Sequence, residues 1–170
     1  MLRTLSLFAF ACLCLGVVSC SHYRLGDALA PTFTTLHIAV VESETPMPQA
    51  RALISTQLRD AFLKDGRVRL VNTSAQADAT LTVTLENYSR TVVVARPDDT
   101  GLARRFELTL QARATLTDQR TQVAQFTDRA LIARSDALTD SGQQQAEFQA
   151  LPLLAAQLAE ITRQAVLDRW

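Results

Sequence analysis

The stretch TLTVTLE, residues 80–86, has the clearest pattern in the chain, because its Leu and Val residues alternate with Thr and Glu. This alternation predicts a strand with one face on a hydrophobic core and the other towards water. The stretch FELTLQARATL, residues 106–116, repeats the pattern, and the turn-forming residues PDDTG, 97–101, lie between the two. We therefore predict a long antiparallel hairpin. The alternation changes register after Asn87, which predicts a bulge or bend there.

Three further stretches have strand character. Residues 36–41 form a β-branched run in which Leu36, Ile38 and Val40 would share one face, and residues 68–71 give a short second strand. A third strand is expected from about Val123 to Ala133. Its predicted inward residues are Ala124, Phe126, Ala130 and Ile132. The segment from Asp136 to Gly142 is predicted to be a polar loop.

Two segments have apolar residues at helical spacing. Residues 50–64 form an amphipathic pattern that Asp65 and Gly66 end, since glycine readily adopts the left-handed conformation that follows a helix. The last helix either begins near Leu151, with Pro152 in its first turn, or begins near Gln143 and is disturbed at Pro152. We favour the start near Gln143. The predicted fold is an α+β two-layer sandwich, with two amphipathic helices on one face of a mostly antiparallel sheet.

The N-terminal residues 1–19 have the features of an export signal. Arg3 precedes an uncharged apolar run that is shorter than the ~20 residues of a membrane-spanning helix. The end of the run, VVSC at residues 17–20, resembles the lipobox of bacterial lipoproteins, which implies cleavage before Cys20 and acylation of its thiol and amine. Residues 20–35 would then be the lipidated cysteine and its tether. The Ser that follows Cys20 resembles the pattern that favours the periplasmic face of the outer membrane.

Composition limits the function classes. The 17 basic side chains balance 17 acidic ones, and Arg3 is the basic residue that leaves with the signal. Such a chain lacks the basic surface that nucleic-acid binding requires. With no low-complexity block or internal repeat, residues 36–170 are expected to form one domain.

No catalytic, metal-binding or cofactor-binding constellation is recognisable, so we expect a non-enzymatic protein without cofactor. The two histidines, His22 and His37, lie far from any paired nucleophile. The carboxylates at 98–99, and the pair Asp136 and Asp140, fall in predicted loops, where Asp commonly forms turns. No phosphate-binding glycine motif or metal-ligand cluster occurs.

Four arginines gather around the predicted hairpin tip: Arg90, Arg96, Arg104 and Arg105. Guanidinium groups bind phosphate in a bidentate manner, so these residues are candidates for an anionic ligand. The alternative is an ordinary solvated end of a hairpin, because exposed arginines are common.

The chain as a whole resembles the lipopolysaccharide-assembly lipoproteins of the LptE family. The likeness lies in Cys20 with YRLG at 23–26, DGRVRLV at 65–71, ADATL at 77–81 with YSR at 88–90, and the helix that ends at Trp170. It implies two helices packed on a four-stranded sheet. It also implies a plug and folding partner inside the outer-membrane β-barrel LptD, in contact with lipopolysaccharide.

The resemblance also assigns residues. A basic residue at the end of the strand that leads into the hairpin turn is implicated in lipopolysaccharide binding in the family, and Arg96 stands at that position. A second basic residue belongs in the loop before the last helix. Here residues 136–142 are acidic, and Arg134 lies only at the edge of that segment.

A second hypothesis from another class is a lipoprotein adaptor that activates or scaffolds a cell-envelope enzyme through the polar sheet face. An adaptor needs a long reach. The predicted tether has about fifteen residues and spans at most ~50 Å when fully extended, which favours work close to the outer membrane.

Overall fold

The computed structural model describes residues 31–45, 47–95, 103–138 and 142–168. Cys20, Arg96 and the hairpin tip lie outside these residues. The elements in chain order are β1 (Thr35–Ile38), β2 (Glu42–Ser43), α2 (Pro48–Asp65), β3 (Arg69–Val71), the 3-10 turn η1 (Ser74–Gln76), β4 (Ala79–Ala95), β5 (Ala103–Asp118), β6 (Ala124–Leu138) and α3 (Gln143–Leu167).

The six strands form one mixed sheet in the order β3-β1-β4-β5-β6, with β2 paired to β4 beyond the end of β1. The pairs β4–β5 and β5–β6 are antiparallel, whereas β1–β3, β1–β4 and β2–β4 are parallel. The expectation of a mostly antiparallel, four-stranded sheet was therefore wrong. Helix α2 is the crossover that brings the chain back parallel to β1. The two-residue strand β2 is too short to show any alternation in the sequence.

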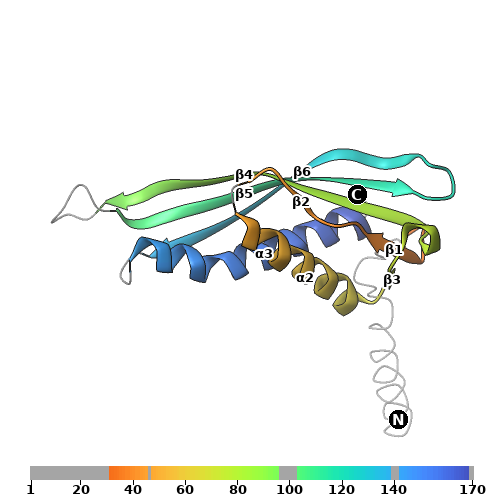
Figure 1. The fold of residues 1–170 in the computed structure, drawn as a ribbon, viewed down its shortest axis with the longest axis horizontal. Coiled ribbons are helices and arrows are strands. Elements are labelled where there is room, and N and C mark those ends of the chain that lie inside the picture. The colour runs from red at the N-terminus through yellow and green to blue at the C-terminus, as the bar shows by residue number, and fades with distance from the viewer. Residues whose placement is uncertain (1–30, 46, 96–102, 139–141, 169–170) are drawn as a thin grey trace, which may run out of the picture.

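Both helices cover the same face of the sheet (Figure 1), as the predicted two-layer α+β arrangement requires. The hydrophobic core fills the space between these layers. Its largest fully buried side chains are Phe62, Leu36, Ile54, Leu58, Leu81, Leu85, Leu108, Leu110, Leu116, Leu154, Leu158 and Leu167. In the first predicted strand, Val40 is 80% exposed and Val41 is buried. That strand ends at Ile38, two residues before Val40.

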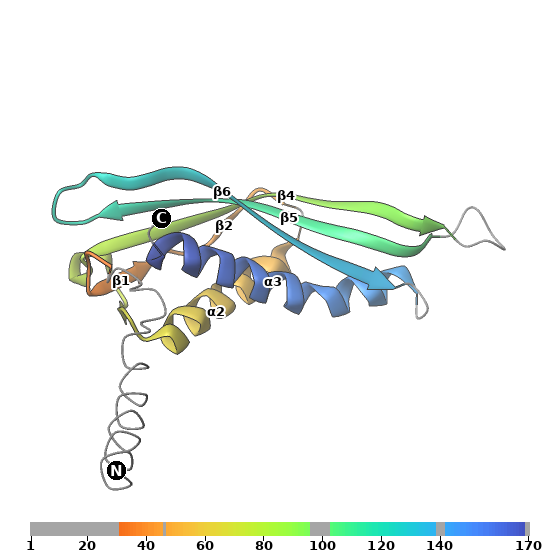
Figure 2. The ribbon, with the colours of Figure 1, turned by 180° about the vertical axis from the view of Figure 1, so that it is seen from behind.

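The long hairpin of β4 and β5 is the largest element pair. Its register shifts between Leu85 and Asn87, which confirms the predicted bulge. The far half of the hairpin extends well beyond the start of α2 and runs alongside the first turns of α3 (Figures 1 and 2). This half of the hairpin carries Arg90, Arg104 and Arg105.

Strand β6 departs from its predicted pattern because it contains a bulge. Two residues of β6, Thr127 and Asp128, oppose the single residue Thr115 of β5. Asp128 has a φ of +49°, and its backbone N–H donates to Thr115 Oγ1 at 3.1 Å. The extra residue moves the following side chains to the other face. Phe126 packs against the core as predicted, but Ala124, Ala130 and Ile132 are exposed. The buried residues of β6 are Leu131, Ala133 and Ala137.

The helix boundaries agree closely with the sequence pattern. Gly66 follows α2 with φ +73°, and its N–H donates to Phe62 O, so it has the left-handed conformation predicted for it. Helix α3 begins at Gln143 and contains Pro152 in its interior, which confirms the longer of the two alternatives. Strand β6 continues to Leu138, so the predicted polar loop begins later than Asp136.

Candidate functional site

Three of the four candidate arginines lie on the far half of the β4–β5 hairpin. Arg90 belongs to β4, and Arg104 and Arg105 belong to β5. Arg96 lies outside the described residues, and so does the side chain of Arg104. The geometry of the candidate site is thus given by Arg90 and Arg105.

Arg90 faces the helices. Its guanidinium group lies over the Phe106 ring, 5.1 Å from the ring centroid, and its Nη1 donates to Glu147 Oε1 in α3. The same Glu147 oxygen accepts a hydrogen bond from Gln143 Nε2 at 3.3 Å. Arg90 is therefore already bound to an internal carboxylate, although its side chain is 40% exposed.

Tyr88 lies two residues before Arg90, on the same face of β4. Its hydroxyl is buried and has no hydrogen-bond partner among the described residues. Burial, and to a smaller extent the charge of Glu147, raises the pKa of Tyr88 to about 12. The tyrosine is neutral at physiological pH, so the charge at this place belongs to Arg90 and Glu147.

Arg105 lies on the opposite face of the hairpin. It precedes Phe106, which is buried under the helices, and neighbouring residues of a strand point to opposite faces. Its Nη1 is 3.9 Å from Asp136 Oδ2 of β6. Arg90 and Arg105 therefore do not form one cluster, and each is paired with an acidic residue.

The face of the sheet away from the helices is polar. Its half-buried side chains include Thr82, Thr84, Thr109, Gln111 and Thr115. Arg113 stands among them and pairs with Glu86 at 2.5 Å and Glu44 at 3.1 Å. This face was anticipated from the alternation of residues 80–86 and 106–116, but its ion pairs were not.

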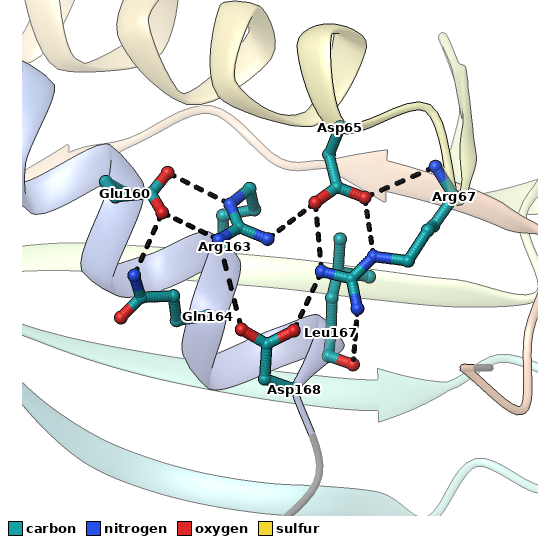
Figure 3. Close-up of polar contacts among 7 residues, drawn as sticks. All are labelled: Asp65, Arg67, Glu160, Arg163, Gln164, Leu167 and Asp168. Atoms are coloured by element: carbon teal, nitrogen blue, oxygen red, sulfur yellow. Dashed lines mark hydrogen bonds and ion pairs between the residues drawn. The ribbon is translucent and has the colours of Figure 1, made fainter. Parts of the chain in front are cut away.

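A second group of charges, also missed in the sequence, ties the ends of the two helices together (Figure 3). Asp65 accepts from Arg67 Nε at 2.7 Å and from Arg163 Nη1 at 2.5 Å. Arg67 also binds Asp168, and Arg163 also binds Glu160. The hydrogen bond from Arg67 lowers the pKa of Asp65. The sequence showed Asp65 only as part of a helix stop, because its partner Arg163 lies near the other end of the chain.

Within the residues that the structure describes, no group of His, Cys, Asp or Glu side chains could hold a metal ion. No described helix has the length and apolar character needed to cross a membrane.

Comparison with known families assigns the chain to one of them. Residues 33–165 match the sequence profile of LptE, described as Lipopolysaccharide-assembly. The chain belongs to the LptE family. This confirms the resemblance seen in the sequence, and it identifies this LptE-family protein as a lipopolysaccharide-assembly lipoprotein. The family is non-enzymatic. No curated protein matches the chain significantly in sequence.

Solved structures share the fold of this LptE-family protein at low sequence identity. An uncharacterized lipoprotein B from Nitrosomonas europaea is 14% identical, with a TM-score of 0.55, over 86% of this chain and 88% of that one. A protein from Xanthomonas campestris is 13% identical, with a TM-score of 0.60, over 82% and 88%. PelC from Paraburkholderia phytofirmans, a dodecamer, is 14% identical, with a TM-score of 0.52, over 86% and 96%. These likenesses concern the fold alone.

Proposed function

We propose that this LptE-family protein is an outer-membrane lipoprotein that acts as plug and folding partner of an LptD-type β-barrel and contacts lipopolysaccharide through its long hairpin. The family match over residues 33–165 is the observation that carries the proposal. Cys20 is the proposed lipidation site, and the lipid would hold the domain at the periplasmic face of the outer membrane.

The polar sheet face supports the plug role. The interior of a large outer-membrane barrel is polar, so a plug must present hydrophilic side chains to the barrel wall. The face formed by Thr, Gln and Arg113 meets this requirement, whereas the opposite face is occupied by the two helices.

The exposed edge of β6 is partly covered, which suits a protein that must not pair with a barrel strand at random. The backbone N–H of Arg134 points away from β5 and donates to Gln157 Oε1 of α3 at 3.0 Å. A side chain from the helix layer therefore occupies a donor that an incoming strand would use.

The first experiment is a pull-down of the tagged, lipidated protein from outer membranes in mild detergent, with quantitative identification of the proteins that co-purify. We expect an LptD-type barrel at a one-to-one ratio. A matched Cys20→Ala variant should lose acylation, so that only contacts with the barrel would keep it in the outer-membrane fraction.

Recovery of a cell-envelope enzyme in place of the barrel would overturn the plug proposal and favour the adaptor hypothesis. Recovery of neither protein would also contradict it, because a plug is held by its barrel.

A further inference from the structure

A groove lies between the start of β6 and the last turn of α3, with a volume of about 480 Å³. Its apolar lining consists of Leu116, Phe126, Ala165 and Val166, and its polar lining of Gln125, Arg129 and Asp168. Such a lining matches a peptide segment that carries both an apolar side chain and a charge.

Arg129 is the cation of this groove, and no carboxylate pairs with it among the described residues. Its Nη1 donates to Ala165 O at 3.0 Å, and its guanidinium group lies 5.4 Å from the centroid of the Phe126 ring. Both of these partners are neutral. The carboxylate in the lining, Asp168, is bound by Arg67 at 2.7 Å. The groove therefore offers an uncompensated positive charge to an anionic occupant.

The described chain begins beside this groove. Gln125 Nε2 donates to Thr32 Oγ1 at 3.5 Å, and Gln125 is part of the lining. The residues that lead up to this contact, LGDALA at 25–30, contain one carboxylate, Asp27, and the apolar side chain of Leu29. Alternate residues of an extended chain point to the same side, so Asp27 and Leu29 can face the groove together.

The spacing of the two charges agrees on both sides of the groove. Arg129 lies four residues after Gln125, which is ~13 Å along a strand. Asp27 lies five residues before Thr32 and can be up to ~18 Å from it. Because Thr32 is held beside Gln125, a segment that runs antiparallel to β6 would bring Asp27 to Arg129.

We propose that residues 25–30 occupy this groove, with the carboxylate of Asp27 on the guanidinium group of Arg129 and the side chain of Leu29 against Phe126. The uncompensated charge of Arg129 selects the acidic residue, and the contact between Thr32 and Gln125 sets the register.

The consequence for function rests on the proposed function, in which Cys20 carries the lipid. With residues 25–30 in the groove, the chain from Cys20 to Leu25 spans at most ~18 Å. The C-terminal end of α3 would then stay close to the membrane. The far half of the hairpin, which runs alongside the first turns of α3, would lie farther from the lipid (Figure 2).

The test is disulfide trapping in the full chain, in isolated cell envelopes. Leu29→Cys is combined with Ala165→Cys in the groove, or with Ala52→Cys, an exposed alanine of α2, as the matched control. Copper phenanthroline oxidises the thiols, and mass spectrometry of proteolytic peptides quantifies each disulfide. We expect a disulfide between positions 29 and 165 as the main product, and none between positions 29 and 52.

The charge pair is tested in the same background. Arg129→Glu should lower the yield of the disulfide several-fold, because it places a second negative charge beside Asp27. The exchange of both charges, Asp27→Arg with Arg129→Glu, should restore the yield. Arg134→Glu changes an exposed arginine of the same strand and should leave the yield unchanged. Circular dichroism of the purified variants shows that each is folded.

Absence of the disulfide to position 165, or an equal yield to position 52, would overturn the proposal. An unchanged yield in Arg129→Glu would refute the charge pair and the register that depends on it. Co-purification of the LptD-type barrel is measured in the same strains. If the barrel is recovered without the disulfide, the groove proposal fails while the proposed function survives. If the disulfide forms and the barrel is missing, the proposed function fails while the groove proposal survives.

Discussion

Asp65, the last residue of α2, pairs with two arginines. Its side chain is 11% exposed and lies between two guanidinium groups, from Arg67 and Arg163. Partly buried charges of this kind depend on each other, because loss of one leaves its partners desolvated without compensation. The group joins the end of α2 to the end of α3 and to the strand that follows α2 (Figure 3).

Asp65→Asn should lower the free energy of unfolding by about 2 kcal/mol, because the hydrogen bonds from two guanidinium groups lose their carboxylate. Urea denaturation followed by circular dichroism measures the change. Asp60→Asn, on the same helix and without an ion-pair partner among the described residues, should stay within about 0.5 kcal/mol. Equal effects of the two substitutions would contradict the structural role of the network.

A second carboxylate, Asp78, binds the backbone at the start of β1. Its Oδ2 accepts hydrogen bonds from the backbone N–H groups of Thr34 at 2.9 Å and Thr35 at 2.8 Å, and from the Thr34 hydroxyl at 2.9 Å. These hydrogen bonds hold the pKa of Asp78 well below its ordinary value, and the bond from the Thr34 backbone N–H has the largest effect.

We predict that stability falls as the pH is lowered below about 4, the ordinary pKa of an unfolded Asp. Between that value and the lower folded-state pKa of Asp78, the unfolded chain binds a proton that the folded chain does not, so protonation favours unfolding. Asp78→Asn should lower stability at pH 7 and reduce the further loss between pH 7 and pH 3. Urea midpoints at both pH values measure this, with Asp60→Asn as control. An identical loss in Asp78→Asn and the unsubstituted protein would refute the assignment.

At the scale of elements, two irregularities shape the surface. The bulge at Asp128 reverses the faces of β6, and Pro152 interrupts the hydrogen bonding of α3 opposite the start of α2. The bulge turns side chains such as Ile132 to the exposed face of β6, and the proline leaves a backbone carbonyl of α3 without its helical donor. In α3 the carbonyl of Phe148 has no N–H donor four residues later, because that residue is Pro152. Beside it lies an apolar groove whose lining includes Leu53 of α2 and Leu151 of α3.

Pro152→Ala should raise the free energy of unfolding by about 1 kcal/mol or more, because alanine restores a helical N–H and a proline in a helix interior costs about 3 kcal/mol. Leu153→Ala is the control, since Leu153 is 67% exposed and its truncation should change little. Thermal and urea unfolding measure both variants. A loss of stability in Pro152→Ala would show that the ring contributes packing that outweighs the restored hydrogen bond.

At the scale of the whole molecule, the hairpin extends beyond one of the two helices that cover the sheet. The core lies between both helices and the sheet and includes Phe106 and Leu108 of β5, while the far half of β4 and β5 runs past α2 (Figure 2).

Charge reversal of Arg96, Arg104 and Arg105 to Glu should weaken lipopolysaccharide binding while leaving the fold intact, because Arg104 and Arg105 lie at the start of β5 and Arg96 is predicted at the hairpin turn. Binding is measured with purified lipopolysaccharide, and folding by circular dichroism. Arg51, Arg59 and Arg69 changed to Glu form a control with equal charge on other elements. Unchanged binding in the hairpin variant would eliminate these arginines as ligands.

The sequence alone determined the elements whose signal is local. Alternation every second residue defined the β4–β5 hairpin and its bulge at Asn87, helical spacing defined α2 and α3, and Gly66 marked a helix end. Each follows from interactions between residues that are close along the chain, so the pattern survives without tertiary context.

The tertiary structure decided the rest, because it depends on residues far apart in sequence. The parallel pairing of β1 with β3 and β4, the reversed face of β6 after Asp128, and the pairing of Arg90 with Glu147, which are 57 residues apart, leave no periodic trace. The sequence identified arginines suited to phosphate. Only packing could place Arg90 and Arg105 on opposite faces, since the face of a side chain depends on every bulge between it and the core.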